Sequence, residues 1–399
     1  MHGARAEGIG ARRPAGVRAG AAAVFAALVA IHALSPVEHV GDARYTVLLA
    51  EHLLRHGSPW LESYFAPPLD PLRTPSVIPW RSDPPRRPGM PYQIEWHGER
   101  ATLLYPHGSA LLSLPAVALL NAAGHSSIAP DGGYDRAGEE RMHRILAAPL
   151  AAAIGALWFA IARRRGLGVA AALALALGVG LATPVWSTAS RALWNHGWGV
   201  LLAALAAAEL AADADRGRAP RAARRATLFG LAFFVRPTAA LPGLLTGAFL
   251  LLAHPRAALR YAAACVVWAG LFLAYQLVAL DRWLPWYYGA LGLVDADRWA
   301  SLAGQLLSPS RGLLVYAPVV LCGPLLLLRY GAPRGWGGVV ALSAGGAVNQ
   351  IGVNAWLPQW WGGNSYGPRL ASEAIPWLTL LALAGLRAAA DAGSLRSER

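Results

Sequence analysis

The chain has 399 residues, of which 55% are apolar and only 14% are charged, against about 25% charged residues in ordinary soluble domains. This composition excludes a disordered chain, a coiled coil and an ordinary soluble enzyme, and recurring apolar runs of about 20 residues indicate a multi-pass membrane protein. The net charge of +13 does not point to nucleic acid, because basic residues gather beside membrane spans on the cytoplasmic side. We therefore expect membrane lipid, and no nucleic acid, among the partners.

The first apolar run covers residues 17–34 and follows a cluster of arginines. We interpret it as a retained first helix and not as a signal peptide, because no small-residue cleavage site follows Leu34 and many more apolar runs come later. The arginine cluster places the N-terminus in the cytoplasm. Cys265 and Cys322 both fall inside later apolar runs, which argues against a disulfide framework and against a cysteine-based zinc site.

Residues 35–102 form the longest polar stretch and should lie on the outer side of the membrane. Proline is frequent from residue 59 to residue 91, so this part is neither a span nor a long helix. Residues 43–56 have a helical pattern, with polar side chains on one face and apolar ones elsewhere. We expect an interfacial helix there, lying in the plane of the membrane surface.

The remaining apolar runs predict further spans. They lie at residues 143–162, 168–185, 194–212, 226–253, 261–280, 312–328, 336–356 and 372–388. The arginine-rich connectors 163–165, 216–225, 256–260 and 329–334, with the C-terminal tail, should then be cytoplasmic.

Two conditions make this arrangement consistent. Residues 106–123, which include Pro115, must be re-entrant or interfacial, and residues 226–253 must be a hairpin of two short arms that turns near Arg236 and Pro237. One tilted helix over 226–253 would invert the orientation of everything after it. Irregular backbone at membrane depth is tolerated only inside protein or beside a water-filled cavity, so the hairpin also predicts a cavity. We expect an all-α integral membrane bundle of about ten crossings, a single domain over residues 1–399, with both termini in the cytoplasm.

In this orientation the outer ends of the spans carry polar, aromatic and mostly cationic groups. Tryptophan and tyrosine at that level commonly form an aromatic belt. The set is Asp42, Tyr105, His107, Arg191, Asn195, His196, Arg236, Tyr287, Tyr288, Ser308, Arg311, Trp360, Trp361, Asn364, Tyr366, Arg369 and Glu373.

Three arginines in this set stand out. Arg236 interrupts an apolar stretch, where a charge costs about 2.5–3.5 kcal/mol; it is either functional or part of a structural ion pair. Arg311 and Arg369 lie in turns that open apolar helices, where free N–H groups, the helix dipole and a guanidinium together suit a phosphate or carboxylate. Glu373 follows Arg369 by four residues, so the two can pair on one helix face.

Asp42 is the candidate acid of the outer face. A carboxylate at the membrane surface can accept a proton from a nucleophilic hydroxyl. The alternative is that Asp42 caps the N-terminus of the helix at 43–56. The nucleotide-binding, metalloprotease and serine-hydrolase motifs of soluble enzymes are absent, and His107, His125 and His143 are too scattered to indicate a metal site.

Five segments together resemble the GT-C superfamily of integral-membrane glycosyltransferases, in its bacterial members. They are YPHGSALL at 105–112, LWNHG at 193–197, RPT at 236–238, SPSRGLLVYAP at 308–318 and WWGGNSYGPR at 360–369. They occur in the family's order and extend over nearly the whole chain. A long outer loop with an acidic residue near its start is also typical of the family.

The resemblance implies a polyprenyl-phosphate sugar as donor, a glycan, lipid or protein as acceptor, and transfer at the outer face of the cytoplasmic membrane. Asp42 would be the catalytic base, and transfer would invert the anomeric centre in a single displacement. No cofactor is implied; a divalent metal is possible, although Asp42 lacks the adjacent acid that some members carry. The expected substrate-binding residues are Arg369, Arg311, Arg236, Tyr366, Glu373, His196, Tyr105 and His107, with no metal ligand among them.

A transporter or flippase of a lipid-linked envelope intermediate is the main alternative. It would share the apolar bundle and the buried arginines. Transporters often contain matching halves with broken helices, whereas here the interrupted segment 226–253 has no evident counterpart. A non-catalytic envelope-assembly protein would need neither the outer acid nor the outer arginines.

Overall fold

The structure is a computed structural model that describes residues 14–36, 40–65, 91–97, 99–216, 220–283, 297–357, 359–363 and 365–393. It is mostly helical. Five helical segments among these residues are long and apolar enough to cross a membrane. They are α1 (Pro14–Ala33), α4 (Arg136–Arg164), α6 (Asn195–Arg216), α9 (Pro255–Leu280) and α15 (Ile375–Asp391), the last together with the short 3₁₀ helix η7 (Arg369–Ala374) before it. The expected all-α, membrane-associated class is confirmed at this level.

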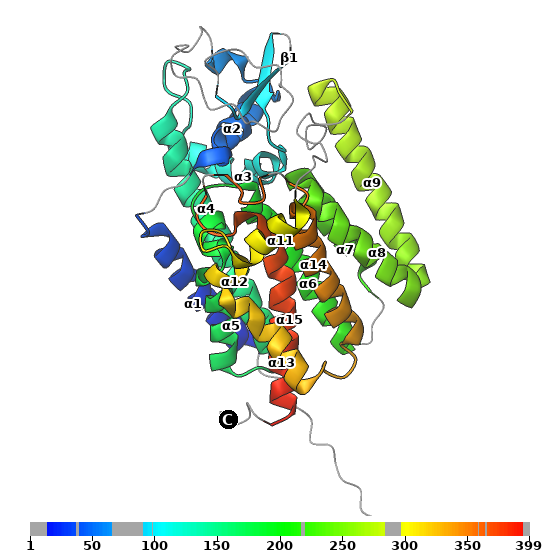
Figure 1. Cartoon of the computed structure of the whole chain (residues 1–399). Coiled ribbons are helices and arrows are strands. Elements are labelled where there is room, and N and C mark those ends of the chain that lie inside the picture. The colour runs from blue at the N-terminus through cyan, green and yellow to red at the C-terminus, as the bar shows by residue number, and fades with distance from the viewer. Residues whose placement is uncertain are drawn as a thin grey trace, which may run out of the picture.

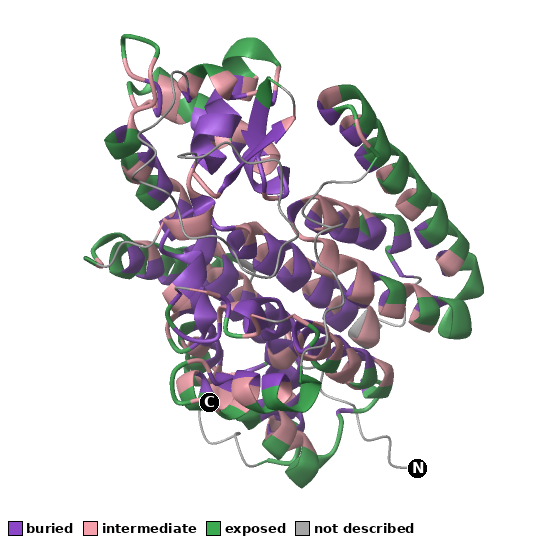
Figure 2. Ribbon diagram, turned by 45° about the horizontal axis from the view of Figure 1, so that its top comes forward, coloured by how far each residue is buried: buried purple, intermediate pink, exposed green. Residues whose placement is uncertain are grey.

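Shorter apolar helices complete the bundle. They are α5 (Val169–Leu181), α7 (Ala222–Val235), α8 (Ala240–Ala253), α13 (Cys322–Tyr330) and α14 (Gly337–Asn354). The α15 helix, red in Figure 1, runs through the middle of the bundle and packs on α6, α13 and α14. Figure 2 shows a buried centre and an exposed α9 at one edge. The large core cluster includes Trp158, Trp336 and Trp377, all fully buried.

Several helices of the bundle start or end at the same side of the bundle. Asp42 follows α1, Asn195 begins α6, Arg236 ends α7, Asn354 ends α14 and Arg369 precedes α15, and all five residues line one cavity. The arginine-rich connectors lie at the far ends of these and neighbouring helices, after α4, before α7 and α9, and after α13. The cavity-lining ends of the helices and the arginine-rich connectors are therefore separated by the length of the bundle.

Residues 226–253 are broken where the sequence predicted a turn. The α7 helix ends at Val235, a 3₁₀ turn (η5, Pro237–Ala239) follows, and α8 begins at Ala240. The arms lie side by side, since a Cβ on Gly243 would approach the Phe229 side chain to 3.5 Å. Because proline lacks the N–H that continues a helix, Pro237 is the local cause of the break.

A small folded cap covers the cavity end of the bundle (top of Figure 1). It consists of α2 (Thr46–His56), the antiparallel strands β1 (Ile94–His97) and β2 (Arg100–Leu103), α3 (Gly108–Ala122) and the start of α4, and it has its own apolar core. Gly108 allows the start of α3 to lie against α7, because a Cβ there would be 2.3 Å from the backbone of Phe234. Arg282, after α9, pairs with Glu95 of β1.

The predicted helix at 43–56 starts three residues late, at Thr46, and its first half is enclosed by the cap. Gly41–Ala43 form a separate 3₁₀ turn (η1), and Tyr45 has a left-handed backbone with φ of 69°. Residues Thr46 to His52 are all buried, because the cap encloses this half of α2. Asp42 makes no capping hydrogen bond to α2, so the N-cap alternative for Asp42 is wrong.

Other sequence expectations differ in detail. The run 168–185 ends as helix at Leu181 and continues into a π-helical turn (η4, Val185–Ala189), and the run 312–328 is divided by Pro318 into α12 (Leu313–Tyr316), a 3₁₀ turn (η6, Pro318–Leu321) and α13. The β-hairpin was not predicted. Most of the proline-rich segment, residues 66–90, lies outside the described residues.

Two buried carboxylates position α2. Glu139 of α4 accepts hydrogen bonds from the backbone N–H groups of Tyr45, Val47 and Leu48 at 3.1–3.2 Å, and from the Tyr134 hydroxyl at 2.6 Å. The carboxylate thus satisfies N–H groups at the start of α2 and lies at the positive end of its dipole. Glu51, farther along α2, accepts from Ser127 N and Oγ at 2.7 Å.

We predict that Glu139→Gln destabilises the protein. The amide keeps the shape but loses the negative charge at the helix start, and hydrogen bonds to a charged group contribute about 1.5–3 kcal/mol each. The melting temperature in detergent should fall by several degrees. Glu140→Gln is the matched control, because Glu140 pairs with the exposed Arg136 and such pairs contribute about 0–1 kcal/mol. Equal melting temperatures for the two variants would contradict the prediction.

Candidate functional site

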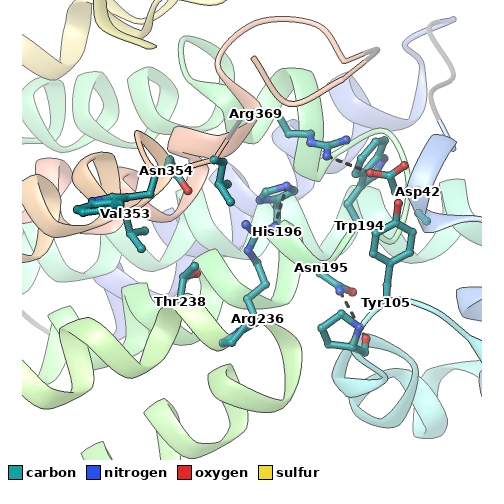
Figure 3. Close-up of a pocket in the computed structure, with 15 residues that line it drawn as sticks. Asp42, Tyr105, Trp194, Asn195, His196, Arg236, Thr238, Val353, Asn354 and Arg369 are labelled. Carbon is teal, nitrogen blue, oxygen red and sulfur yellow. Dashed lines mark hydrogen bonds and ion pairs between the residues drawn. The ribbon is translucent and has the colours of Figure 1, made fainter. Parts of the chain in front are cut away.

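A cavity of about 420 Å³ lies between the cap and the bundle. Figure 3 shows that its wall is built from segments far apart in the sequence. One part is polar and is formed by Asp42, Asn195, His196, Arg236, Thr238, Asn354 and Arg369. The other part is apolar and includes Pro237, Val353, Trp356 and Leu357. The cavity predicted from irregular backbone is therefore present, and Arg236 with its η5 turn forms part of the wall.

Asp42 and Arg369 form an ion pair in this wall. Arg369 Nη2 lies 3.0 Å from Asp42 Oδ2, and both side chains are mostly buried. The Tyr92 hydroxyl donates to Asp42 Oδ1 at 2.7 Å. The Arg369 guanidinium also stacks on Trp194, 4.6 Å from the ring centroid, in the manner of a cation–π contact.

The protonation of Asp42 follows from these contacts. Burial by itself would raise the pKa of the carboxyl group, but the positive charge of Arg369 and hydrogen bonds from Tyr92 and Tyr105 outweigh it and hold the pKa below its usual 3.8. Asp42 is therefore a carboxylate at neutral pH. It is also a weak base while Arg369 remains beside it, because a low pKa means poor proton affinity.

Tight turns place the two partners. Asp42 sits in η1, the first described element after α1, and Arg369 opens η7 after a glycine-containing turn. Gly367 has a φ of +68°, which a residue with a Cβ rarely adopts. Arg311 lies beside the same turn, and its Nη2 donates to the carbonyl of Gly363 at 3.2 Å.

A second charged cluster lies beside the first and joins three helical segments. Arg236 Nε is 3.0 Å from Glu373 Oε1, and His196 Nδ1 is 2.7 Å from the same oxygen. Arg236 Nη1 also lies 3.2 Å from His196 Nε2. These partners fit a neutral His196 that donates from Nδ1 to Glu373 and accepts at Nε2 from Arg236. The cluster fixes the Arg236 guanidinium at the cavity wall.

The expected pairing of Glu373 with Arg369 is wrong. Arg369–Ala374 form a 3₁₀ helix and not an α-helix. In a 3₁₀ helix, with three residues per turn, side chains four apart are rotated by about 120°, so they face different directions. Arg369 therefore pairs with Asp42, whereas Glu373 faces α6 and Arg236.

Four of the expected substrate-binding residues lie outside the cavity wall: Glu373, described above, and Arg311, Tyr366 and His107. Arg311 supports the turn described above, and Tyr366 is exposed with its ring against Tyr316. His107 is buried: its Nε2 is 3.0 Å from the Leu103 carbonyl and its Nδ1 is 2.7 Å from the Tyr275 hydroxyl. Burial lowers its pKa to about 4, and the neutral ring ties the cap to α9.

The cavity brings together five of the predicted site residues, namely Asp42, Tyr105, His196, Arg236 and Arg369. Glu373 contacts two of them, His196 and Arg236, from behind the wall.

Other residues of the site were not identified from sequence. Tyr92 lies fifty positions from Asp42 within the proline-rich loop, where no periodicity indicated a contact. Asn354 ends α14 and donates from Nδ2 to the Leu370 carbonyl at 2.6 Å, so it holds η7 in place. The sequence signal that could have identified Asn354 is a polar residue near the end of the apolar run 336–356.

Within the part of the chain that the structure describes, no group of three or more histidine, cysteine, aspartate or glutamate side chains is arranged to hold a metal ion. Asp42 and Glu373 both face arginines in preference to another acid. The charged part of the site is therefore built from two carboxylate–guanidinium pairs.

A scan against protein-family models, a search of curated proteins and a search of solved structures each return no match.

We predict that the stabilising effect of the Asp42–Arg369 pair disappears in acid. Because the folded-state pKa of Asp42 is lowered, its contribution is present above the unfolded value of 3.8 and is lost as pH falls through the lower folded value. Arg369→Gln should therefore lower the melting temperature more at pH 7 than at about pH 3. A difference that stays constant between these pH values would contradict the ion-pair interpretation.

Proposed function

We propose that the protein is an integral-membrane glycosyltransferase that moves a sugar from a polyprenyl-phosphate donor to an acceptor hydroxyl. The observation that carries the proposal is one cavity lined by a carboxylate, two guanidinium groups and a set of apolar side chains. The family resemblance of the five sequence segments supports the same function. Four of the five segments contribute at least one residue to the cavity wall.

The charges of the cavity suit a phosphate ester. Arg369 and Arg236 present N–H donors from two directions, and a guanidinium matches phosphate oxygens in a bidentate manner. Arg236 is fixed by Glu373 and His196, so its orientation does not have to be established when the ligand binds. The apolar wall at Val353, Trp356 and Leu357 would receive the first isoprene units.

Transfer would proceed by a single displacement. The acceptor oxygen attacks the anomeric carbon while the bond from that carbon to the phosphate oxygen breaks, and its electron pair goes to the phosphate. Asp42 takes the acceptor's proton, and Arg369 and Arg236 stabilise the charge that develops on the leaving phosphate. Attack opposite the leaving group inverts the anomeric centre. Tyr92 and Tyr105 orient Asp42.

The arrangement of the helices favours about ten crossings, with α7 and α8 as two short arms and both termini in the cytoplasm. Arginine-rich connectors gather at the end opposite the cavity, which the positive-inside rule assigns to the cytoplasm. Each arm has 14 residues and a length of about 21 Å, short of the roughly 30 Å hydrocarbon layer. The η5 side of the cavity would then lie below the outer membrane surface.

We predict that Asp42→Asn reduces transfer by about 100-fold or more, because an amide cannot accept the proton and positioned bases contribute about 10²–10⁴-fold. Arg369→Ala should raise the Kd for the donor, since it removes one of the two guanidiniums. The measurement uses protein reconstituted in liposomes with a labelled polyprenyl-phosphate sugar and candidate acceptors.

Glu140→Gln and Arg141→Ala are matched controls on the exposed start of α4. Full transfer by Asp42→Asn would refute the assignment of the base. Movement of the lipid-linked sugar across the bilayer without any transfer would favour the flippase instead.

We predict that Asp131 and Arg334 lie on opposite sides of the membrane. Asp131 is in the exposed turn before α4, and Arg334 is exposed between α13 and α14. In a variant with Cys265 and Cys322 replaced by alanine, Asp131→Cys should react with an impermeant maleimide in intact cells. Arg334→Cys should react only after permeabilisation. Reaction of both in intact cells would mean that 226–253 crosses once.

A further inference from the structure

The cavity contains no uncompensated cation among its described residues. Arg369 is paired with Asp42, and Arg236 is paired with Glu373. An incoming phosphate must therefore compete with a carboxylate for at least one guanidinium. The two pairs differ in how firmly they hold their arginine, and this difference decides which one yields.

Arg236 is held by two protein groups in a closed arrangement. Glu373 and His196 both contact its guanidinium, and they also contact each other at 2.7 Å. Removing Arg236 from this cluster would leave a buried carboxylate without its cation, which is strongly unfavourable. Arg236 is therefore a fixed cation.

Arg369 is held more loosely. Its Nη2 contacts Asp42, and it has no histidine partner of the kind that His196 provides for Arg236; the Nε–H groups of both arginines are buried without a well-aligned hydrogen-bond acceptor among the described residues. Its other partner is the Trp194 ring face, and a cation–π contact persists over a range of positions within about 6 Å of the centroid. With one carboxylate and one ring face as its partners, the guanidinium can shift while it stays on Trp194.

Asp42, in contrast, keeps partners when Arg369 moves. The Tyr92 hydroxyl donates to Oδ1, whereas Arg369 lies against Oδ2. Loss of the arginine therefore removes the cation from Oδ2, while hydrogen bonds from Tyr92 and Tyr105 keep the side chain in place. Asp42 lines the same cavity in which the acceptor would bind.

We propose that Arg369 exchanges partners when the donor binds. Before binding, Arg369 pairs with Asp42; on binding, Arg369 moves to the donor's phosphate. Asp42 is then free to accept a proton. This inference rests on the proposed function and concerns the regulation of the same site. This exchange makes the base available only after the donor's phosphate has bound.

The test is a binding measurement that needs no turnover. Polyprenyl monophosphate is titrated into purified protein in detergent at fixed salt, and the Kd is compared between wild type and Asp42→Asn. Removal of the competing carboxylate should tighten binding by about three- to tenfold, since charge-assisted pairs of this kind are worth a factor of that order or more. Asp42→Glu retains the charge and should bind as wild type does.

Three controls make the result specific. Polyprenol, which lacks the phosphate, should bind wild type and Asp42→Asn equally. Adding Arg369→Gln to Asp42→Asn should abolish the gain, because the freed guanidinium is then absent. If Asp42→Asn does not fold, as judged by its elution and melting, Asp42→Ser replaces it, since a hydroxyl can still accept from Tyr92.

The outcomes separate this inference from the proposed function. Equal or weaker binding of polyprenyl monophosphate by the uncharged Asp42 variants would overturn the exchange while leaving the glycosyltransferase proposal standing. Failure of wild type to bind polyprenyl monophosphate at all would overturn both. Tighter binding that persists in the Arg369→Gln background would place the effect on another cation and would also overturn the exchange.

Discussion

The structure depends on the neutralisation of two arginines that are mostly buried inside the protein. A charge inside an apolar bundle is unfavourable unless an opposite charge meets it with good geometry. Two carboxylates provide this, each from a segment distant in sequence from its arginine: Asp42 after α1 meets Arg369 before α15, and Glu373 meets Arg236 between α7 and α8. These pairs connect the beginning, the middle and the end of the chain around one cavity, so the bundle and the site share the same contacts.

The cap follows the same principle with backbone groups in place of arginines. The N-terminus of α2 is buried, so its free N–H groups need acceptors, and Glu139 supplies them. Tyr45 remains in a left-handed conformation, which is unusual for a residue with a side chain, because its N–H is held by that carboxylate. The short turn that carries Asp42 is thereby connected to α4, and the position of the acid depends on a residue almost a hundred positions away.

Much of this was predictable from sequence where the signal was local. Apolar length indicated the helices, and an arginine followed by proline inside an apolar run indicated the break at Arg236. The assignment of Asp42 and Arg369 to one end of the molecule followed from counting the spans. The partners of each charge could not be predicted, because spacing of four residues implies contact only in an α-helix, and η7 is a 3₁₀ helix. The contact of Tyr92 with Asp42, like the β-hairpin, depends on the fold of the cap and has no periodic signature.

The two arginines differ because their acids are held differently. Glu373 is buried within the bundle, and its contacts with His196 and Arg236 close on one another, so none of the three can move without leaving a buried group unpaired. Asp42 lies in a turn at the junction of cap and bundle, has a tyrosine partner of its own and shares only one oxygen with Arg369. A cavity with one fixed and one displaceable cation can orient an anion and still respond to its arrival. Two fixed cations would orient the anion equally well, but the neighbouring carboxylate would then stay paired with its arginine when the anion arrived.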